Sequence, residues 1–323
     1  MRAVFLDLQT IRPTDLDLTA LKSTCTELTS YDSTTPAQVI ERIKNAECVI
    51  SNKVYLGQAE LSAAAQLKLI CVAATGTNNV DLAAAHALGI TVCNAQSYST
   101  ESVAQHTFSL LLMLATNMQH YVDDVQNGAW SQSTMFCLLN HPIVELSGKT
   151  LGIIGYGAIG QRVAHIAKAF GMRVLIAGLP GRESAGRLPL DAMLPECDVV
   201  SIHCPLTEST KNLFDHARIR KMKPNAWLIN VGRGGIVNET DLLTALKEKT
   251  IAAAALDVLA QEPPAADHLL INAKRHNLLI TPHNAWASSQ ARQNLVRQIA
   301  ENINHYRTGA TVRAIQYNCN DAT

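Results

Sequence analysis

The sequence predicts an α/β protein with two doubly wound parallel sheets. Short apolar runs alternate with helix-like stretches through most of the 323 residues. The runs are apolar throughout, as expected for parallel strands that helices cover on both faces. Hydrophobic residues make up 47% of the chain and charged residues 17%, which is typical of a folded α/β protein.

The larger domain is predicted at 99–287. Its apolar runs recur about every 25 residues, which is the length of one strand and one helix. Such a series predicts a parallel sheet whose ligands bind at the carboxyl ends of the strands. The six runs are 150–154, 173–177, 198–203, 226–231, 251–258 and 277–281.

The smaller domain is predicted at 1–98 plus 288–323, in two pieces of chain. Its runs are 3–7, 48–51, 69–73 and 90–93, and helical segments such as 36–45 lie between them. A helix is predicted at 100–116, crossing between the domains. The amphipathic stretch 288–306 is expected to return to the first domain.

A glycine pattern at the start of the larger domain predicts a dinucleotide site. Gly155, Gly157 and Gly160 stand at the G-x-G-x-x-G spacing, after the run 150–154 and before a helical stretch at 161–170. The first glycine permits a tight turn, the second lets a pyrophosphate approach the backbone, and the third lets helix and strand pack closely. Free N–H groups of the helix N-terminus, at Ala158 and Ile159, then face the anion. This predicts a Rossmann domain.

Charge and cysteine usage exclude several classes of function. The formal net charge is zero, so nothing indicates binding to nucleic acid or to an anionic membrane. None of the eight cysteines forms a C-x-x-C, so we expect no metal site and no redox pair. The N-terminal apolar run is too short for a signal peptide, and we expect a cytoplasmic protein.

Five strings in order resemble one family, the D-isomer-specific 2-hydroxyacid dehydrogenases. They are the glycine fingerprint, H-C-P-L-T-E-S-T from His203, I-N-V-G-R-G from Ile229, A-L-D-V-L-A-Q-E-P from Ala255 and T-P-H-N-A-W from Thr281. The resemblance is greatest to the glycerate dehydrogenase (hydroxypyruvate reductase) branch, through A-A-T-G-T-N-N-V-D and H-N-A-W. It implies a Rossmann domain inserted into a smaller flavodoxin-like substrate domain. It also implies a homodimer that reduces a small 2-keto acid, such as hydroxypyruvate or glyoxylate, to the D-hydroxy acid.

Three residues are the catalytic candidates. Arg233 follows a predicted strand, and its guanidinium matches a carboxylate and stays charged. His283 also follows a strand, and histidine is the natural general acid near neutral pH. The resemblance pairs His283 with Glu262, whose carboxylate would fix the imidazole tautomer.

The cofactor candidates combine the fingerprint with later strand ends. The resemblance places Asp257 against the nicotinamide carboxamide and His203 along the cofactor pocket. Gly178 stands where NAD-binding domains usually carry an acid for the ribose 2′-hydroxyl, and Arg182 follows. NADPH is therefore expected to be accepted or preferred, with NADH still usable. The other candidates are Cys204, Pro205, Thr210, Val231 and Gly232.

The substrate candidates lie in the smaller domain. Backbone N–H groups of Thr75, Gly76 and Thr77 can form an anion nest for a carboxylate after the run 69–73. Asn52 and Lys53 follow the run 48–51 and are expected near the same ligand.

The connector that carries Trp130, Met135 and Phe136 has two open interpretations. It either contributes to a dimer interface and closes the substrate pocket, or takes part in ordinary core packing.

Three other classes of protein share this fold and are alternatives to a 2-keto acid reductase. Formate dehydrogenase typically carries glutamine at the position of Glu262, which argues against it. Phosphoglycerate dehydrogenase with an appended domain fits poorly, because only about 40 residues follow His283. A dinucleotide-sensing co-repressor keeps the catalytic residues, but nothing in the sequence indicates the peptide-binding surface it needs.

Overall fold

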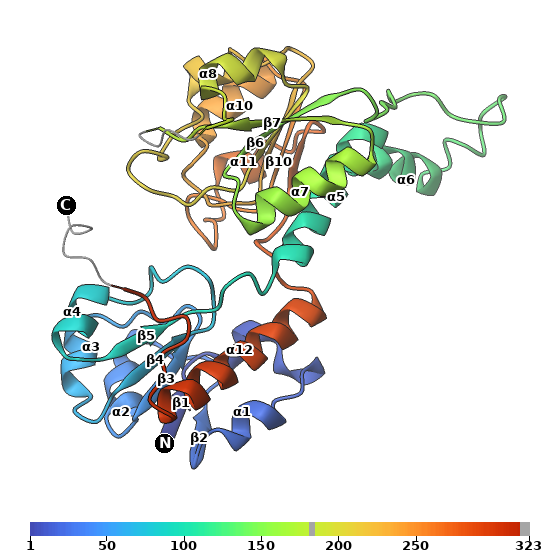
Figure 1. The fold of residues 1–323 in the computed structure, drawn as a ribbon. Helices are drawn as coiled ribbons and strands as arrows, with labels where there is room; N and C mark the ends of the chain where they lie inside the picture. The colour runs from blue at the N-terminus through green and yellow to red at the C-terminus, as the bar shows by residue number, and fades with distance from the viewer. Residues whose placement is uncertain (181–184, 317–323) are drawn as a thin grey trace. The chain divides into compact units, whose positions relative to one another are not determined.

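The structure is a computed structural model that describes residues 1–180 and 185–316. The chain divides into two compact units (Figure 1). Unit 1 contains Met1–Ser99 and the chain from Ala287 onward, and unit 2 contains Thr100–Trp286. Each unit holds one parallel sheet with helices, so the predicted α/β class with two doubly wound sheets is confirmed.

Unit 1 is built on a parallel sheet in the order β2-β1-β3-β4-β5. This is the flavodoxin-like order, in which the chain reverses direction across the sheet between β1 and β3. The strands are β1 (Arg2–Phe5), β2 (Glu27–Ser30), β3 (Cys48–Ser51), β4 (Leu69–Val72) and β5 (Thr91–Cys93). The apolar-run criterion missed β2, because this edge strand is half-buried to exposed and carries polar residues.

The helices of unit 1 come from both ends of the chain. The C-terminal helix α12 (Ser289–Arg307) lies against α1 and β4. Arg292 of α12 is 6% exposed and donates to Asp15 at 2.6 and 2.7 Å and to the carbonyls of Ile11 and Arg12. The other helices are α1 (Thr19–Ser23), α2 (Val39–Ile43), α3 (Gln58–Ala63) and α4 (Leu82–Ala87), with 3-10 turns at Leu8–Ile11, Pro13–Asp15 and Pro36–Gln38.

Unit 2 is built on a parallel sheet in the order β11-β10-β9-β8-β6-β7. An isolated parallel bridge between Ala177 and Leu188 continues it beyond β7. With this bridge in place of a third strand the order is that of a Rossmann domain, and β6 and β8 flank the switch point. The strands are β6 (Thr150–Ile154), β7 (Arg173–Ala177), β8 (Val199–Ile202), β9 (Trp227–Asn230), β10 (Ala253–Leu256) and β11 (Leu278–Ile280).

Helices cover both faces of this sheet. The predicted helix at 100–116 is α5 (Thr100–Thr116), which packs on α7 (Ala158–Ala169) beside β9 and β10. The remaining helices are α6 (Met118–Gln126), α8 (Leu190–Met193), α9 (His216–Ile219), α10 (Glu239–Lys247) and α11 (Leu269–Asn272), with a 3-10 turn at Leu194–Glu196.

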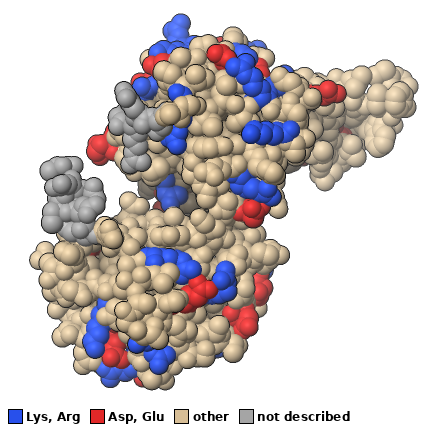
Figure 2. All heavy atoms as spheres, viewed as in Figure 1, with Lys and Arg blue, Asp and Glu red and all other residues tan. Residues whose placement is uncertain are grey.

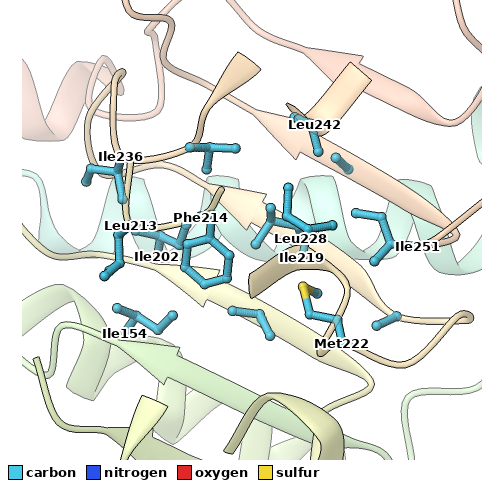
Figure 3. Close-up of a cluster of buried hydrophobic side chains, with 14 of the residues drawn as sticks. Ile154, Ile202, Leu213, Phe214, Ile219, Met222, Leu228, Ile236, Leu242 and Ile251 are labelled. Atoms are coloured by element: carbon cyan, nitrogen blue, oxygen red, sulfur yellow. The ribbon is translucent and has the colours of Figure 1, made fainter. Parts of the chain in front are cut away.

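Alternate strand residues enter two separate cores in unit 2. Ile202 and Leu228 pack around Phe214 on one face of the sheet (Figure 3). Val199 and Ile229 face the opposite core, beneath α5 and α7. Both faces are buried because neighbouring side chains point to opposite sides, which explains why the runs read as continuously apolar.

The segment after α5 carries an unusual concentration of exposed apolar side chains. In Figure 1, α6 and the loop after it project from the rest of unit 2. Phe136 is 91% exposed and Leu139 is 70% exposed. Other exposed members are Val122, Val125, Trp130, Met135 and Ile143. The side chains of Trp130, Met135 and Phe136 therefore do not take part in core packing within the described chain.

The surface charge is mixed in sign. On the face shown in Figure 2, lysine and arginine side chains are interspersed with aspartate and glutamate. Within residues 1–180 and 185–316, no helix combines the length and the apolar character that crossing a membrane requires.

Candidate active site

The glycine fingerprint forms the turn between β6 and α7. Gly155 has a φ of 91°, a left-handed conformation that side chains disfavour. A Cβ there would also lie 2.5 Å from the backbone nitrogen of Cys204. Gly157 caps α7, and a Cβ at this position would have no neighbouring atom within 4 Å. The backbone at the helix N-terminus is therefore open to a ligand.

These residues fit a dinucleotide. Ala158 and Ile159 begin α7, where backbone N–H groups have no partner within the helix. Gly160 packs directly on the carbonyl of Gly155. The open space at Gly157 and the free N–H groups together give the arrangement that accepts a pyrophosphate. A nicotinamide dinucleotide would supply the hydride in such a site.

The loop after β8 borders the same turn. His203 Nε2 lies 2.9 Å from Ser201 Oγ, and its Nδ1 is buried with no hydrogen-bond partner among the described residues. Burial lowers the pKa of His203 to about 3, so the ring is neutral at physiological pH. Burial also raises the pKa of Cys204 to about 11. Neither residue is suited to proton transfer, and the unpaired Nδ1 has its hydrogen-bonding capacity left for a ligand, as donor or acceptor according to the tautomer of the ring.

The two remaining candidates of this loop have different surroundings. Thr210 is buried, and its hydroxyl donates to Pro205 O at 2.7 Å and accepts from Thr207 N. This bonding closes the loop, so Thr210 shapes the site without a free hydroxyl proton. Pro205 is exposed.

The end of β7 carries no carboxylate in the described residues. Gly178 directly follows β7, and its N–H donates to Leu188 O at 2.8 Å. Arg182 lies outside the described residues, and Arg187 is half-buried beyond them. The predicted arginine contact to a 2′-phosphate therefore stays a prediction.

Arg233 lies in a loop that Asn230 holds closed after β9. The buried Asn230 side chain accepts from Gly232 N at 3.0 Å and donates to Arg233 O at 2.9 Å. Val231 is buried, and Arg233 is half-buried. A Cβ at Gly234 would overlap the carbonyl of Leu259, so the loop packs directly on the chain after β10. Only glycine allows this approach.

Glu262 and His283 are in contact. His283 Nδ1 lies 2.6 Å from Glu262 Oε2, and Glu262 Oε1 accepts from Leu259 N at 2.9 Å. The carboxylate therefore holds Nδ1 protonated and leaves Nε2 to exchange a proton. Because Gly234 also packs on Leu259, the loops of Arg233, Glu262 and His283 form one continuous layer.

The backbone of His283 has a φ of 50°, which is uncommon for a residue with a side chain. Its N–H donates to Asp257 O at 2.8 Å, and its carbonyl accepts from Trp286 Nε1 at 3.0 Å. Asp257 is 1% exposed, and its carboxylate accepts from Thr281 Oγ1 and from the N–H groups of Asn284 and Ala285. Asp257 thus holds the 281–285 loop, and a nicotinamide contact would have to use its one remaining acceptor position on Oδ2.

In unit 1, Asp7 holds the loop with two substrate candidates. Its buried carboxylate accepts from Lys53 N at 2.6 Å and from Asn52 N at 2.9 Å. The Asn52 amide donates to Thr10 Oγ1 at 3.0 Å, and Asn52 is 4% exposed. A substrate contact by Asn52 would use the second N–H of its amide or the amide oxygen. Lys53 is exposed.

The loop after β4 holds the other three substrate candidates. Thr75 is exposed, and Gly76 and Thr77 are half-buried. Asn94 donates to Thr75 O at 2.7 Å, which fixes the start of the loop. None of the hydrogen bonds found in the described chain uses a backbone N–H of these three residues. This leaves the donors available for the predicted anion nest.

Sequence reasoning missed four residues that organise these loops: Asp7, Asn230, His106 and Trp286. Asp7 and Asn230 share one signal, a polar residue at or shortly after the end of a buried strand. His106 and Trp286 carry no such signal, because their partners are distant in sequence or are backbone atoms. In the described chain, no group of three or more His, Cys, Asp or Glu side chains is placed to hold a metal ion.

Comparisons with known proteins find relatives over most of the chain. The family profile "D-isomer specific 2-hydroxyacid dehydrogenase, NAD binding domain" matches residues 108–285. The chain is 42% identical to a glycerate dehydrogenase of Methylorubrum extorquens, over 90% of this chain and 92% of the relative. It is 36% identical to a hydroxypyruvate reductase of Blautia hydrogenotrophica, over 98% and 99%.

A solved structure shares the fold as well. It is an NADPH-dependent glyoxylate/hydroxypyruvate reductase from Sinorhizobium meliloti in complex with citrate. Its TM-score is 0.83 at 27% identity, and the match covers 97% of both chains.

Proposed function

Since this chain belongs to the family of D-isomer-specific 2-hydroxyacid dehydrogenases, we propose that its substrates are hydroxypyruvate and glyoxylate, reduced to D-glycerate and glycolate. The chain is an oxidoreductase that uses NAD(P)H to reduce a 2-keto acid. Relatives named for glycerate, hydroxypyruvate and glyoxylate support the choice of small substrates. The observation that carries the proposal is the His283–Glu262 pair, which follows β11 and β10 in the sheet in which Arg233 follows the neighbouring strand β9.

Each residue has a chemical task in this reaction. The Arg233 guanidinium binds and orients the substrate carboxylate through charge-assisted hydrogen bonds. His283 donates a proton to the keto oxygen as the hydride reaches the carbonyl carbon, and takes it back in the oxidative direction. Glu262 orients the imidazole and stabilises its charged form. The bound dinucleotide supplies the hydride.

The cofactor preference is proposed from the residue at the end of β7. Gly178 places no carboxylate beside a 2′-phosphate, so NADPH is accepted or preferred and NADH stays usable. The Sinorhizobium relative is named as NADPH-dependent, which supports this choice. Arg182→Ala is expected to raise the KM for NADPH and leave that for NADH unchanged. Equal KM values for NADPH before and after the change would remove Arg182 from the site.

The assembly is proposed to be a homodimer that buries the apolar segment at α6 and 127–145. Phe136 at 91% exposure is the strongest support, because a side chain of this size rarely stays in water. Sedimentation of the wild-type protein and of Phe136→Asp tests this, with a dimer and a weakened dimer as the expected results. The cytoplasmic location stays a prediction.

The alternatives are less well supported. Formate dehydrogenase needs no proton donor, whereas Glu262 holds His283 in a proton-donating arrangement at 2.6 Å. A dinucleotide-sensing binding protein would bind cofactor without turnover.

The test is the initial rate of nicotinamide oxidation with hydroxypyruvate, glyoxylate and pyruvate, each with NADH and NADPH. Hydroxypyruvate or glyoxylate is expected to be turned over fastest. Cofactor binding without turnover of any of the three would contradict the proposal and favour the binding protein. Preference for pyruvate would correct the substrate.

A further inference from the structure

Two side chains of α5 contact the loop that carries His283. Ser102 Oγ donates to Ala285 O at 2.6 Å, and His106 Nε2 lies 3.0 Å from Thr281 Oγ1. These residues are four positions apart and therefore share one face of the helix. The helix thus contacts both ends of the 281–285 loop.

The single proton of the Thr281 hydroxyl determines which groups donate the hydrogen bonds among His106, Thr281 and Asp257. The Thr281 hydroxyl donates to Asp257 Oδ1 at 2.6 Å. A hydroxyl has a single proton, so Thr281 Oγ1 accepts from His106. His106 therefore carries a proton on Nε2, which also lies 3.5 Å from Asp257 Oδ1.

Asp257 is the point at which this network reaches the backbone of His283. All of the hydrogen bonds found for the Asp257 carboxylate go to residues of the 281–285 loop. The loop holds His283 at a φ of 50°, a conformation with a backbone cost that the surrounding bonds must offset. Loss of the His106 donor would free the Thr281 hydroxyl to rotate and weaken one of these bonds.

We propose that His106 is a positioning residue for the reaction: through Thr281 and Asp257 it holds the left-handed backbone that aims the His283 imidazole. This inference rests on the proposed proton-donating role of His283. His106 itself has no contact with substrate in the proposal, and its side chain is 21% exposed. Its contribution is geometric, because a proton donor acts only when it lies within hydrogen-bond reach of the reacting oxygen.

The kinetic test compares His106→Leu, which removes the donor, with His106→Gln, which keeps an N–H near the position of Nε2. Gln105→Ala is the control, because Gln105 is the exposed neighbour on α5. We expect His106→Leu to lower kcat about tenfold, below the 100-fold cost that a misplacement of about 1 Å can carry. KM and the cofactor Kd are expected to change less than about twofold. His106→Gln is expected to recover most of kcat, and Gln105→Ala to match the wild type.

A wild-type kcat in His106→Leu would overturn the inference. So would a His106→Gln variant that is as slow as His106→Leu, because the side chain would then matter only for packing.

A second readout needs no turnover, so it separates this inference from the proposed function. In long-range ¹H–¹⁵N spectra of histidine-labelled protein, His106 is expected as the Nε2–H tautomer. The His283 ring signals should shift in His106→Leu and return in His106→Gln. An Nδ1–H tautomer at His106, or unchanged His283 signals, would overturn the inference even if the enzyme turns over no tested substrate.

Discussion

In each of the two units, a buried aspartate carboxylate after one strand holds the loop that follows a neighbouring strand. In unit 1 the buried carboxylate of Asp7 follows β1 and accepts N–H groups from the loop after β3. In unit 2 the buried carboxylate of Asp257 follows β10 and accepts from the loop after β11. The first loop presents an exposed lysine, Lys53, and the second presents a histidine paired with a glutamate.

The difference shows what each loop is suited to do. The loop in unit 1 presents an exposed positive side chain, Lys53, as a site that binds an anion would. The loop in unit 2 fixes the tautomer of His283 through Glu262 and its backbone through Asp257. We therefore propose that the loop after β3 takes part in substrate binding together with Arg233, and that the loop after β11 carries proton transfer.

The largest effect is expected for His283→Ala. General acid catalysis by a positioned side chain contributes about 10²–10⁴-fold, so kcat should fall by about this factor. The Kd for NADPH, measured by fluorescence, should stay within about twofold. Loss of both together would mean that His283 supports the fold of the site instead of the chemistry.

Arg233→Ala is expected to have the next largest effect. Loss of charge-assisted hydrogen bonds to the substrate carboxylate should lower kcat/KM on the order of 100-fold, or about 3 kcal/mol. Lys211→Ala, which changes an exposed cation of the same unit, is the control. An unchanged kcat/KM in Arg233→Ala would remove this residue from the site.

Glu262→Gln should have a smaller effect, because glutamine keeps the length of the side chain and one acceptor oxygen, which can serve either Leu259 N or His283 Nδ1–H. Loss of the negative charge beside the imidazole should lower kcat about tenfold, with KM nearly unchanged. The measurement is kcat across pH for the variant and the wild type. A kcat equal to that of the wild type would show that the carboxylate charge has no part in proton transfer.

Asp15→Asn is expected to change stability slightly and activity not at all. The hydrogen bond from Arg292 lowers the pKa of Asp15 from 3.8 to about 2. The ion pair therefore stabilises the folded chain above about pH 4, and this contribution disappears as the pH falls toward 2. Thermal unfolding should show a small difference from the wild type at pH 7 that shrinks by pH 3. A difference independent of pH, or the same behaviour in Asp267→Asn, would contradict this origin.

Sequence analysis predicted the elements that are determined by residues close together in the chain. The strands β6 and β7 have the predicted bounds, because both runs are apolar; β6 is buried along its length, whereas β7 is half-buried. The edge strand β2 was not predicted, because it is not fully buried on either face. The glycine turn was found because its spacing is local as well.

The hydrogen bonds that hold the loops of the site could not be predicted in the same way. Asp7 and Asn52 are 45 positions apart, and His106 and Thr281 are 175 positions apart. No local pattern joins such residues. The contact of Glu262 with His283 was expected only from the family resemblance, since 21 positions separate them.

The measurement that tests the different roles of these two loops most directly is a comparison of Asp7→Asn with Asp257→Asn. Both variants remove one carboxylate oxygen that accepts loop N–H groups, so each is the control for the other. At saturating NADPH, Asp7→Asn is predicted to raise the KM for hydroxypyruvate with kcat nearly unchanged. Asp257→Asn is predicted to lower kcat with KM nearly unchanged. The same pattern in both variants, or the reverse, would contradict the assignment of binding to one loop and proton transfer to the other.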